Sequence, residues 1–242
     1  MRYVVELSYI CSEKFAGWQI QKNKLSYQQL FESAFEKVLN VKISLQASGR
    51  TDSGVSAIKQ VAHFDYDQLL PKNFVGHINS ILPEEARVLN VYTADSDFHA
   101  RFSAKCKTYK YYFYVSKINI PYFDTFAHQV KTVIDDKVLT KQVKSLVGSH
   151  NFKSFCASGS SVTDFTRTIY SADIEKKNQL YEFTICGNGF LYNMVRIIVG
   201  TLIDIASGKL NYNINKIISL ENREFAGKTA PAKGLVLFDV NY

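Results

Sequence analysis

Apolar and polar residues follow regular patterns in several parts of the chain. The segment 2–9 carries an apolar side chain at every second position, a period of two that predicts a β-strand. The segment 26–39 repeats instead with the 3.6-residue period of an amphipathic helix. Ser26 followed by Gln29 is the capping-box pattern of a helix N-terminus, so it marks where this helix begins.

Further elements follow from the same patterns. Helices are predicted over 73–82, 135–147 and 190–206. Strands are predicted over 43–46, 60–66, 107–115, 168–174, 180–186 and 235–240. The order strand, helix, strand, strand, helix therefore occurs twice, with no sequence repeat behind it.

This element order predicts an α+β fold of two halves. Some neighbouring strands have no helix between them, which favours antiparallel sheets over a parallel βαβ arrangement. We place the boundary near residues 102–105. The expected domains are an N-terminal half, 1–104, which carries the candidate aspartate loop described below, and a C-terminal half, 105–242.

Charge and aromatic content narrow the class of partner. Among 242 residues, 29 lysines and arginines outnumber 22 acidic residues, which gives a net charge of +7 and favours an anionic partner. Aromatic residues make up 14% of the chain, including 15 tyrosines. Tyrosines with excess lysines can stack on bases and hold phosphates. Strands rich in Tyr and Phe explain the same composition equally well.

Cysteine usage and hydropathy bear on location. The four cysteines include no C-x-x-C pair, and scattered thiols fit a reducing compartment. The strand-like N-terminus does not have the pattern of a signal peptide, and the most apolar stretch, 190–206, is too short and too polar to span a bilayer. We therefore expect a cytoplasmic protein without a membrane anchor. The five histidines lack ligand spacing, so no metal site is expected.

A polar segment between two predicted strands is the first candidate for chemistry. Asp52 and Arg50 lie in this segment, bracketed by Gly49 and Gly54. Two glycines permit a tight loop that presents a side chain, but a surface turn has the same composition. No Gly-Lys-Ser/Thr sequence follows, so the evidence for a phosphate-binding loop is weak. No second acid stands out to pair with Asp52 as in a glycosidase.

Two other constellations combine cations with aromatic or apolar residues. Residues 98–114 interleave Arg101 and three lysines with Tyr109 and three further tyrosines. This pattern suits RNA binding, and it suits a half-buried strand with a solvated lysine edge equally well. Arg196 stands among apolar residues of the helix predicted over 190–206. A buried guanidinium needs an anionic partner, unless its stem carries the charge to the surface.

Several of these segments together resemble the TruA family of tRNA pseudouridine synthases. Residues 49–55 match that family's G-R-T-D-[AS]-G-V signature. Five further blocks occur in family order at 17–19 (GWQ), 98–102 (FHARF), 148–155 (GSHNFKSF), 189–200 (GFLYNMVRIIVG) and 234–235 (GL). The chain departs from the family pattern at Ile10-Cys11, where Asp-Gly is usual, and at Ser56, where His is common.

The resemblance implies a fold and a reaction. The fold would be a pseudouridine synthase fold, with two ferredoxin-like or RRM-like halves whose antiparallel sheets join into one extended sheet around a central cleft. The reaction would isomerise uridine to pseudouridine at positions 38, 39 and 40 in the anticodon stem-loop of tRNA. It would need neither cofactor nor metal, and the family implies a homodimer that contacts one tRNA with both subunits.

The resemblance also assigns roles to residues. Asp52 would be the catalytic aspartate, Tyr109 would assist proton transfer at C5, and Arg196 would pair with Asp52 and favour its charged form. Substrate contacts would come from Arg50, Leu235, Tyr109 and Arg101. Arg50 would fill the gap that the flipped base leaves in the stem, and Tyr109 and Leu235 would pack on the two faces of the uracil.

Three rival interpretations stay open at this point. A non-catalytic RNA-binding module would keep the basic surface, but it is disfavoured because Asp52, Tyr109 and Arg196 are all present. The same chemistry could serve another RNA. An unrelated aspartate-dependent hydrolase would release a free base or phosphate instead of an isomer.

Overall fold

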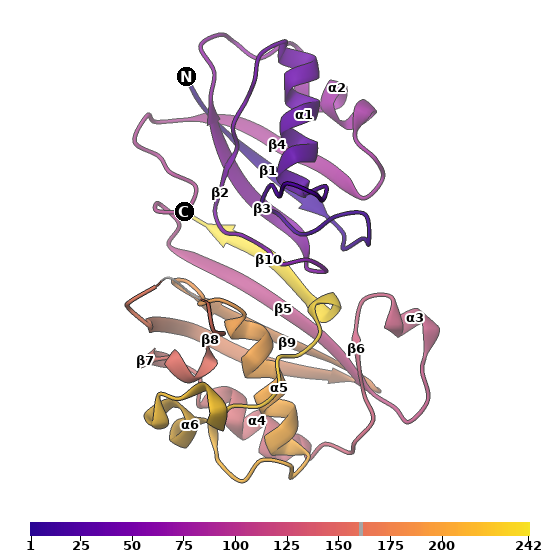
Figure 1. Ribbon diagram of the computed structural model, residues 1–242, viewed down its shortest axis with the longest axis vertical. Coiled ribbons are helices and arrows are strands. Elements are labelled where there is room, and N and C mark those ends of the chain that lie inside the picture. Colours follow the sequence, from indigo (N-terminus) through magenta and orange to yellow (C-terminus); the bar gives the residue numbers. More distant parts are fainter. Residues whose placement is uncertain (160–161) are drawn as a thin grey trace. The chain divides into compact units, whose positions relative to one another are not determined.

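The computed structural model describes residues 1–159 and 162–242 and has a mixed α/β architecture with mostly antiparallel strands (Figure 1). The chain divides into two compact units. The first comprises Met1–Lys105 together with Val236–Tyr242, and the second comprises Cys106–Leu235. The C-terminal segment thus returns to the first unit, whereas the division drawn from the sequence groups it with the second half.

The first unit is built on a sheet with β1 and β3 at its centre. Its strands lie in the order β4 (Ala86–Ala94), β1 (Arg2–Tyr9), β3 (Ser56–Asp65) and β10 (Leu235–Asn241), and β2 (Gln46–Ala47) also pairs with β3. β1 is antiparallel to β3 and β4, whereas β10 is parallel to β3. Val236 and Leu237 pair with β3, and the Tyr242 hydroxyl donates to the Ala100 carbonyl (2.7 Å). These contacts hold the C-terminal strand in the first unit.

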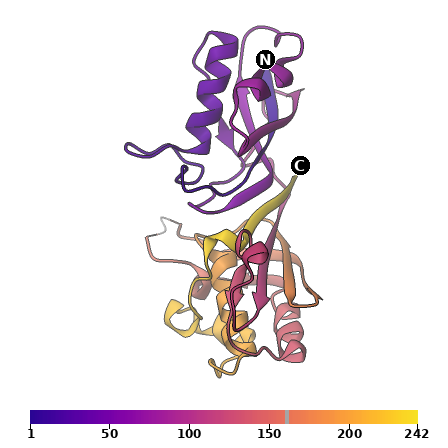
Figure 2. The same ribbon diagram turned by 90° about the vertical axis from the view of Figure 1, so that its right-hand side faces the viewer.

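Two helices, α1 (Tyr27–Leu39) and α2 (Phe74–Ile81), complete the core of the first unit. The hydroxyl of Ser26 accepts from the Gln29 backbone N–H at 3.2 Å, so the predicted helix start is confirmed. The ring of Phe35 on α1 lies 5.5 Å from that of Phe64 on β3 and 5.3 Å from that of Phe74 on α2. Edge-on aromatic contacts therefore join α1 to the sheet and α2 to α1. Figure 2 shows α1 standing to one side of the strands.

The second unit contains the remaining strands of the sheet. Its strands lie in the order β6 (His128–Val130), β5 (Cys106–Val115), β9 (Leu180–Gly187), β8 (Thr166–Lys177) and β7 (Gly148–Asn151). Its helices are α3 (Pro121–Asp124), α4 (Asp136–Lys144), α5 (Met194–Ala206) and α6 (Ile214–Leu220), with short 3-10 turns at Lys153–Phe155, Arg223–Phe225 and Ala232–Gly234. β5, β9, β8 and β7 are antiparallel neighbours, and β6 is parallel to β5. α4 contacts both α5 and β8, so the helices pack on this sheet.

The boundaries differ from the sequence pattern where local geometry overrides periodicity. The helix predicted over 190–206 begins at Met194, because Asn193 takes a left-handed conformation with a φ of 59°. The elements β4, β6, β7 and α6 have no counterpart in the pattern, because they are short or carry many polar side chains. In the nine-residue β4, for example, only Ala86 and Val88 are buried.

A close backbone contact fixes the segment before the C-terminal strand onto α5. A Cβ at Gly200 would overlap the Lys228 carbonyl oxygen, so only glycine fits there. Hydrogen bonds to α5 residues before and after Gly200 reinforce this contact. Gly227 N–H donates to the Thr201 hydroxyl (2.9 Å), and Ala230 N–H donates to the Arg196 carbonyl (3.1 Å). The segment 227–230 is therefore seated along the helix.

Gly200→Ala is expected to lower the free energy of unfolding by more than about 2 kcal/mol, because the added methyl group must push the 228 backbone off the helix. An ordinary helical Gly→Ala change is neutral or stabilising. Gly76→Ala in α2 is the matched control, since its new Cβ meets only the movable side chain of Asn73. Urea denaturation of both variants measures the difference. Equal effects in the two variants would contradict the role assigned to the Gly200 contact.

Candidate active site

The Asp52 loop connects β2 to β3 in the first unit and spans residues 48–55. The Asp52 side chain is half-buried and the Arg50 side chain is exposed. A turn follows Asp52, in which Val55 N–H donates to the Asp52 carbonyl (3.2 Å) and Gly54 has a φ of +81°. The second glycine of the motif thus supplies a left-handed conformation two residues after Asp52.

Buried polar side chains anchor the first half of this loop. The Tyr9 hydroxyl lies 2.8 Å from the Thr51 hydroxyl oxygen. The amide of Gln60 donates to the Gly49 carbonyl (2.8 Å), and its oxygen accepts from the Ser48 hydroxyl (2.7 Å). Burial raises the pKa of Tyr9 to about 12, so its phenol keeps its proton at neutral pH. The sheet therefore holds the loop at three successive points.

The Gly-Trp block at 17–18 supports the same loop from its other side. Trp18 N–H donates to the Thr51 carbonyl (3.0 Å). Gly17 has a φ of +82°, and a Cβ there would lie 2.6 Å from the Thr51 carbonyl and 2.8 Å from the backbone of Asp52 and Ser53. The carbonyls of Gly17 and Trp18 also accept the first backbone N–H groups of α1. The block therefore ties the aspartate loop to the helix start.

The two departures from the family pattern lie next to each other in the structure. The backbone N–H of Cys11 donates to the hydroxyl of Ser56 at 2.8 Å. Ser56 begins β3 directly after the Asp52 loop. The serine therefore links the end of the loop to the segment after β1.

The segment 98–102 lies in the same unit and contacts β2. The ring of His99 hydrogen-bonds to the Gln46 side chain (3.1 Å). Gln46 lies on β2, two residues before the Asp52 loop begins. His63 on β3 accepts from the Ala100 N–H through Nδ1 (3.1 Å). Arg101 is exposed, with its guanidinium 5.5 Å from the centre of the Phe102 ring. These contacts fix the backbone that carries Arg101.

Tyr109 lies in the second unit, on β5 opposite Ile185 of β9. Its side chain is half-buried. The ring of Phe190 meets it edge-on, with centroids 5.1 Å apart. Phe190 belongs to the block that precedes α5, so this contact orders the tyrosine ring against the approach to that helix.

Arg196 is held on the first turn of α5 by named acceptors. Its Nε donates to the Ala230 carbonyl (2.8 Å), and a terminal nitrogen donates to the Asn193 side-chain oxygen (2.7 Å). Asn193 itself has a left-handed backbone conformation directly before α5. The guanidinium is half-buried rather than directed along its stem to open solvent.

Leu235 follows the segment that α5 holds, and its side chain is 7% exposed. A Cβ at Gly234 would lie 2.6 Å from the Tyr112 carbonyl, which brings this backbone onto β5. The Tyr111 hydroxyl donates to the Pro231 carbonyl (2.8 Å), and burial raises the pKa of this tyrosine. Lys233 also pairs with Asp124. The position of Leu235 is thus fixed from both sides.

The structure places Arg50 and Asp52 in one loop, with Arg101 in the same unit, whereas Tyr109, Arg196 and Leu235 lie in the second unit. Sequence reasoning did not find the residues that support the loop and Arg196, which are Tyr9, Gly17, Trp18, Thr51, Gln60 and Asn193. Gly17, Trp18, Thr51 and Asn193 lie inside the matching blocks, which could have indicated them. Tyr9 stands where the family pattern Y-D-G has its tyrosine, whereas Gln60 carries no such signal.

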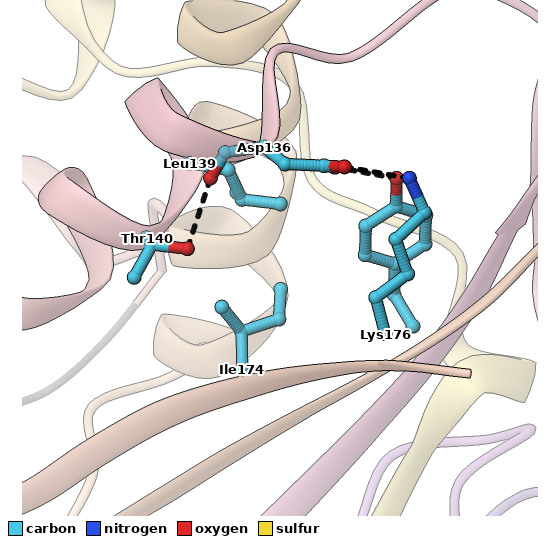
Figure 3. A pocket seen from close by; sticks show the side chains of 6 residues that line it. Asp136, Leu139, Thr140, Ile174 and Lys176 are labelled. Atoms are coloured by element: carbon cyan, nitrogen blue, oxygen red, sulfur yellow. Dashed lines mark hydrogen bonds and ion pairs between the residues drawn. The ribbon is translucent and has the colours of Figure 1, made fainter. Parts of the chain in front are cut away.

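A small pocket elsewhere in the second unit holds none of the predicted site residues (Figure 3). It is lined by Asp136, Leu139, Thr140, Ile174, Lys176 and Tyr181. Asp136 accepts from Lys176 (2.6 Å) and from the Tyr181 hydroxyl (2.7 Å). The Lys176 hydrogen bond lowers the pKa of Asp136. The charged and phenolic groups of the pocket satisfy one another, which is typical of a structural ion pair between α4 and the sheet.

Residues 1–159 and 162–242 contain no group of three or more acidic, histidine or cysteine side chains arranged to hold a metal ion. None of their helices combines the length and apolar character needed to cross a bilayer.

Known proteins resemble the chain over its whole length. It is 39% identical to tRNA pseudouridine synthase A of Shouchella clausii (strain KSM-K16), across 100% of this chain and 93% of that protein. It is 40% identical to tRNA pseudouridine synthase A of Geobacillus sp. (strain WCH70), across 94% and 93%. This chain belongs to the tRNA pseudouridine synthase A family.

Family membership makes the chain a pseudouridine synthase, an isomerase. A family model described as tRNA pseudouridine synthase matches residues 143–242, which include Arg196 and Leu235. The full-length relatives extend the similarity over the Asp52 loop. Among solved structures, the chain is similar to "Crystal Structure of a Cbf5-Nop10-Gar1 Complex" at 12% identity and a TM-score of 0.40, over 83% of this chain and 44% of that one.

The environment of His63 predicts a pH dependence for the first unit of this family member. Burial, and then the nearby His99, lower the pKa of His63 from its ordinary value of 6.5. The unfolded chain then binds this proton more readily than the folded chain, so stability is full above pH 6.5 and falls as the pH drops through the folded pKa.

His63→Asn keeps an acceptor for the Ala100 N–H and removes the titration. We expect its melting temperature to fall less than that of the wild type between pH 7 and about pH 5. His77→Asn, at an exposed position, is the control and should keep the wild-type slope. His128, whose pKa burial also lowers, titrates alike in all three proteins. Parallel slopes for His63→Asn and the wild type would contradict the assignment.

Proposed function

We propose that this chain isomerises uridine to pseudouridine at positions 38, 39 and 40 in the anticodon stem-loop of tRNA, with Asp52 as the catalytic carboxylate. The observation that carries the proposal is the Asp52 loop. It matches the family signature, and buried contacts from Tyr9, Gln60, Gly17 and Trp18 hold the backbone around a half-buried carboxylate. A loop fixed in this way suits a group that must meet one sugar carbon in a defined geometry.

The proposed reaction consumes no reactant other than the uridine itself. The N1–C1′ bond of the uridine breaks, the base rotates in place, and C5 bonds to C1′. C5 gives up a proton and N1 gains one, so substrate and product are isomers. The Asp52 carboxylate either attacks C1′ or accepts a proton from the sugar, and both routes require its charged form.

Access to C1′ requires the uridine to leave its stack, which costs a few kcal/mol that protein contacts must offset. Arg50 supports this step, because its side chain is exposed two residues before Asp52 on the same fixed loop. We propose that its guanidinium occupies the gap that the flipped base leaves. Arg101, also exposed on a fixed backbone, is proposed to contact phosphates.

The remaining roles follow the family resemblance. Tyr109 is proposed to stack on the uracil and to assist proton transfer at C5, Leu235 to pack on the other face, and Arg196 to act as the counter-ion of Asp52. The contacts of each residue within its own unit support these assignments, because Phe190 orders the Tyr109 ring and Asn193 orders the Arg196 guanidinium.

The proposal extends to the organisation of the enzyme. It includes a homodimer in the cytoplasm, and halves 1–104 and 105–242 of ferredoxin-like form whose sheets join around a cleft. The net charge of +7 supports an RNA substrate. Binding carried by lysine and arginine contacts to phosphates should weaken as salt concentration rises.

Asp52→Asn is expected to abolish turnover while tRNA binding stays within about twofold, because the amide keeps the shape of the carboxylate and loses its charge. Tritium release from tRNA labelled at uridine C5 measures turnover, and filter binding measures affinity. Asp67→Asn, at an exposed position of the same unit, is the control and should keep wild-type turnover. Tritium release by Asp52→Asn at a rate near wild type would sink the assignment.

Arg196→Met is expected to cost at least about a hundredfold in turnover, because the charge opposite the proposed nucleophile or base is lost. The substitution also leaves the Ala230 carbonyl without its side-chain donor, which should lower the free energy of unfolding by about 1–3 kcal/mol.

Arg223→Met is the matched control, because Arg223 also donates to a backbone carbonyl, that of Ala226 (3.2 Å), and is partly buried. Both variants should lose similar stability in thermal denaturation, and only Arg196→Met should lose turnover. Equal retention of turnover in the folded fractions would show that Arg196 is structural.

A further inference from the structure

The loop that carries Asp52 rests on a polar network inside an otherwise apolar core. Tyr9 is 3% exposed and Gln60 is fully buried, and both lie on the central strands of the first sheet. Their polar atoms contact the loop as well as each other. The Tyr9 hydroxyl contacts Thr51 at 2.8 Å, and Gln60 contacts both Gly49 and Ser48. Burial without these partners would be costly, so loop and network constrain each other.

The network is continuous from strand to loop. The Gln60 amide lies 3.5 Å from the Tyr9 hydroxyl, which links the two strand residues. The hydroxyl of Thr51 therefore binds a tyrosine whose orientation is set on both sides. The ring of Tyr9 is stacked on that of Tyr27, with centroids 4.2 Å apart, so the phenol cannot swing away without disturbing the α1 contact.

Thr51 directly precedes Asp52, and its two ends are bound to different parts of the unit. Its side chain meets Tyr9 on β1, while its carbonyl accepts from the Trp18 N–H. Because Thr51 is anchored through both its side chain and its backbone, the Cα of Asp52 has little freedom to move. Small displacements of a reacting group cost rate rather than binding.

We propose that Tyr9, Thr51 and Gln60 form a positioning network that holds the Asp52 carboxylate in its reactive geometry. The inference rests on the proposed function of Asp52 and adds residues that touch neither uridine nor reacting atoms. They act through the loop backbone. Loss of the Tyr9–Thr51 hydrogen bond should therefore lower kcat more than it changes KM.

The test uses Tyr9→Phe, Thr51→Val and the double variant in the full chain. Each single change removes one side of the same hydrogen bond with little change of shape. We expect each to lower kcat about tenfold with KM within about twofold, and the double variant to be no worse than the poorer single variant. Thr51→Ser keeps the hydroxyl and should restore kcat to near wild type.

Tyr3→Phe is the matched control. Tyr3 lies on the same strand, is 4% exposed, and donates its hydroxyl proton to the Gln68 carbonyl at 3.0 Å, away from the Asp52 loop. It should lose as much thermal stability as Tyr9→Phe and keep its kcat. Hydrogen exchange of residues 48–55 adds a readout that does not depend on catalysis, and it should accelerate in Tyr9→Phe and Thr51→Val but not in Tyr3→Phe.

The possible results test the positioning network and the proposed function of Asp52 separately. Unchanged kcat in both Tyr9→Phe and Thr51→Val, or kcat losses that multiply in the double variant, would overturn the positioning role. Unchanged exchange of the loop would overturn the claim that the network holds it. Wild-type turnover in Asp52→Asn would overturn the proposed function instead, and the exchange comparison would still decide whether the network orders the loop.

Discussion

The contact between Gly17 and the backbone of residues 51–53 is the constraint on which the candidate active site depends. A side chain at position 17 would overlap the Thr51 carbonyl and the Asp52 and Ser53 backbone, and the φ of +82° excludes most residues independently. The contact places the loop against the segment that begins α1. The buried hydrogen bonds from Tyr9 and Gln60 then act on a loop that already has a fixed distance from the helix.

The second unit uses the same device. Glycines at 200 and 234 allow backbone segments to approach α5 and β5 more closely than any side chain would permit. Arg196 contacts the end of the segment 227–230 at Ala230, and Leu235 directly follows Gly234. In both units, close glycine contacts thus fix the backbone near residues to which we assign chemistry, and side-chain hydrogen bonds such as Tyr9–Thr51 and Arg196–Asn193 add to them.

Much of the architecture could be predicted from periodicity. The strand at 2–9 and the helix that begins after Ser26 follow their patterns closely, because each buries one continuous apolar face. The edge strand β4 could not be predicted in the same way, because only Ala86 and Val88 are buried and they leave no alternation along the rest of the strand. The first residue of α5 could not be predicted either. The apolar run begins before Asn193, and the left-handed backbone at that residue makes the helix begin only after it.

Some residues of the candidate site could likewise be predicted from the sequence, and others could not. Asp52, Arg50 and Arg196 stand out as charged residues in glycine-bracketed or apolar surroundings, which makes them candidates, and the family resemblance assigns their roles. The supporting residues do not stand out. Tyr9 occupies an apolar position of a strand, and only the folded structure shows that its hydroxyl meets Thr51. Gln60 is a polar residue in a central strand whose partners come from residues 11 and 12 positions earlier.

The most direct measurement is a single-nucleotide map of pseudouridine after the purified protein is incubated with an unmodified tRNA transcript, in the presence of a chelator and without added cofactor. The account predicts pseudouridine at uridines 38 to 40 and at no other uridine. A transcript that binds the protein but returns unmodified at these positions, or modified elsewhere, would contradict it.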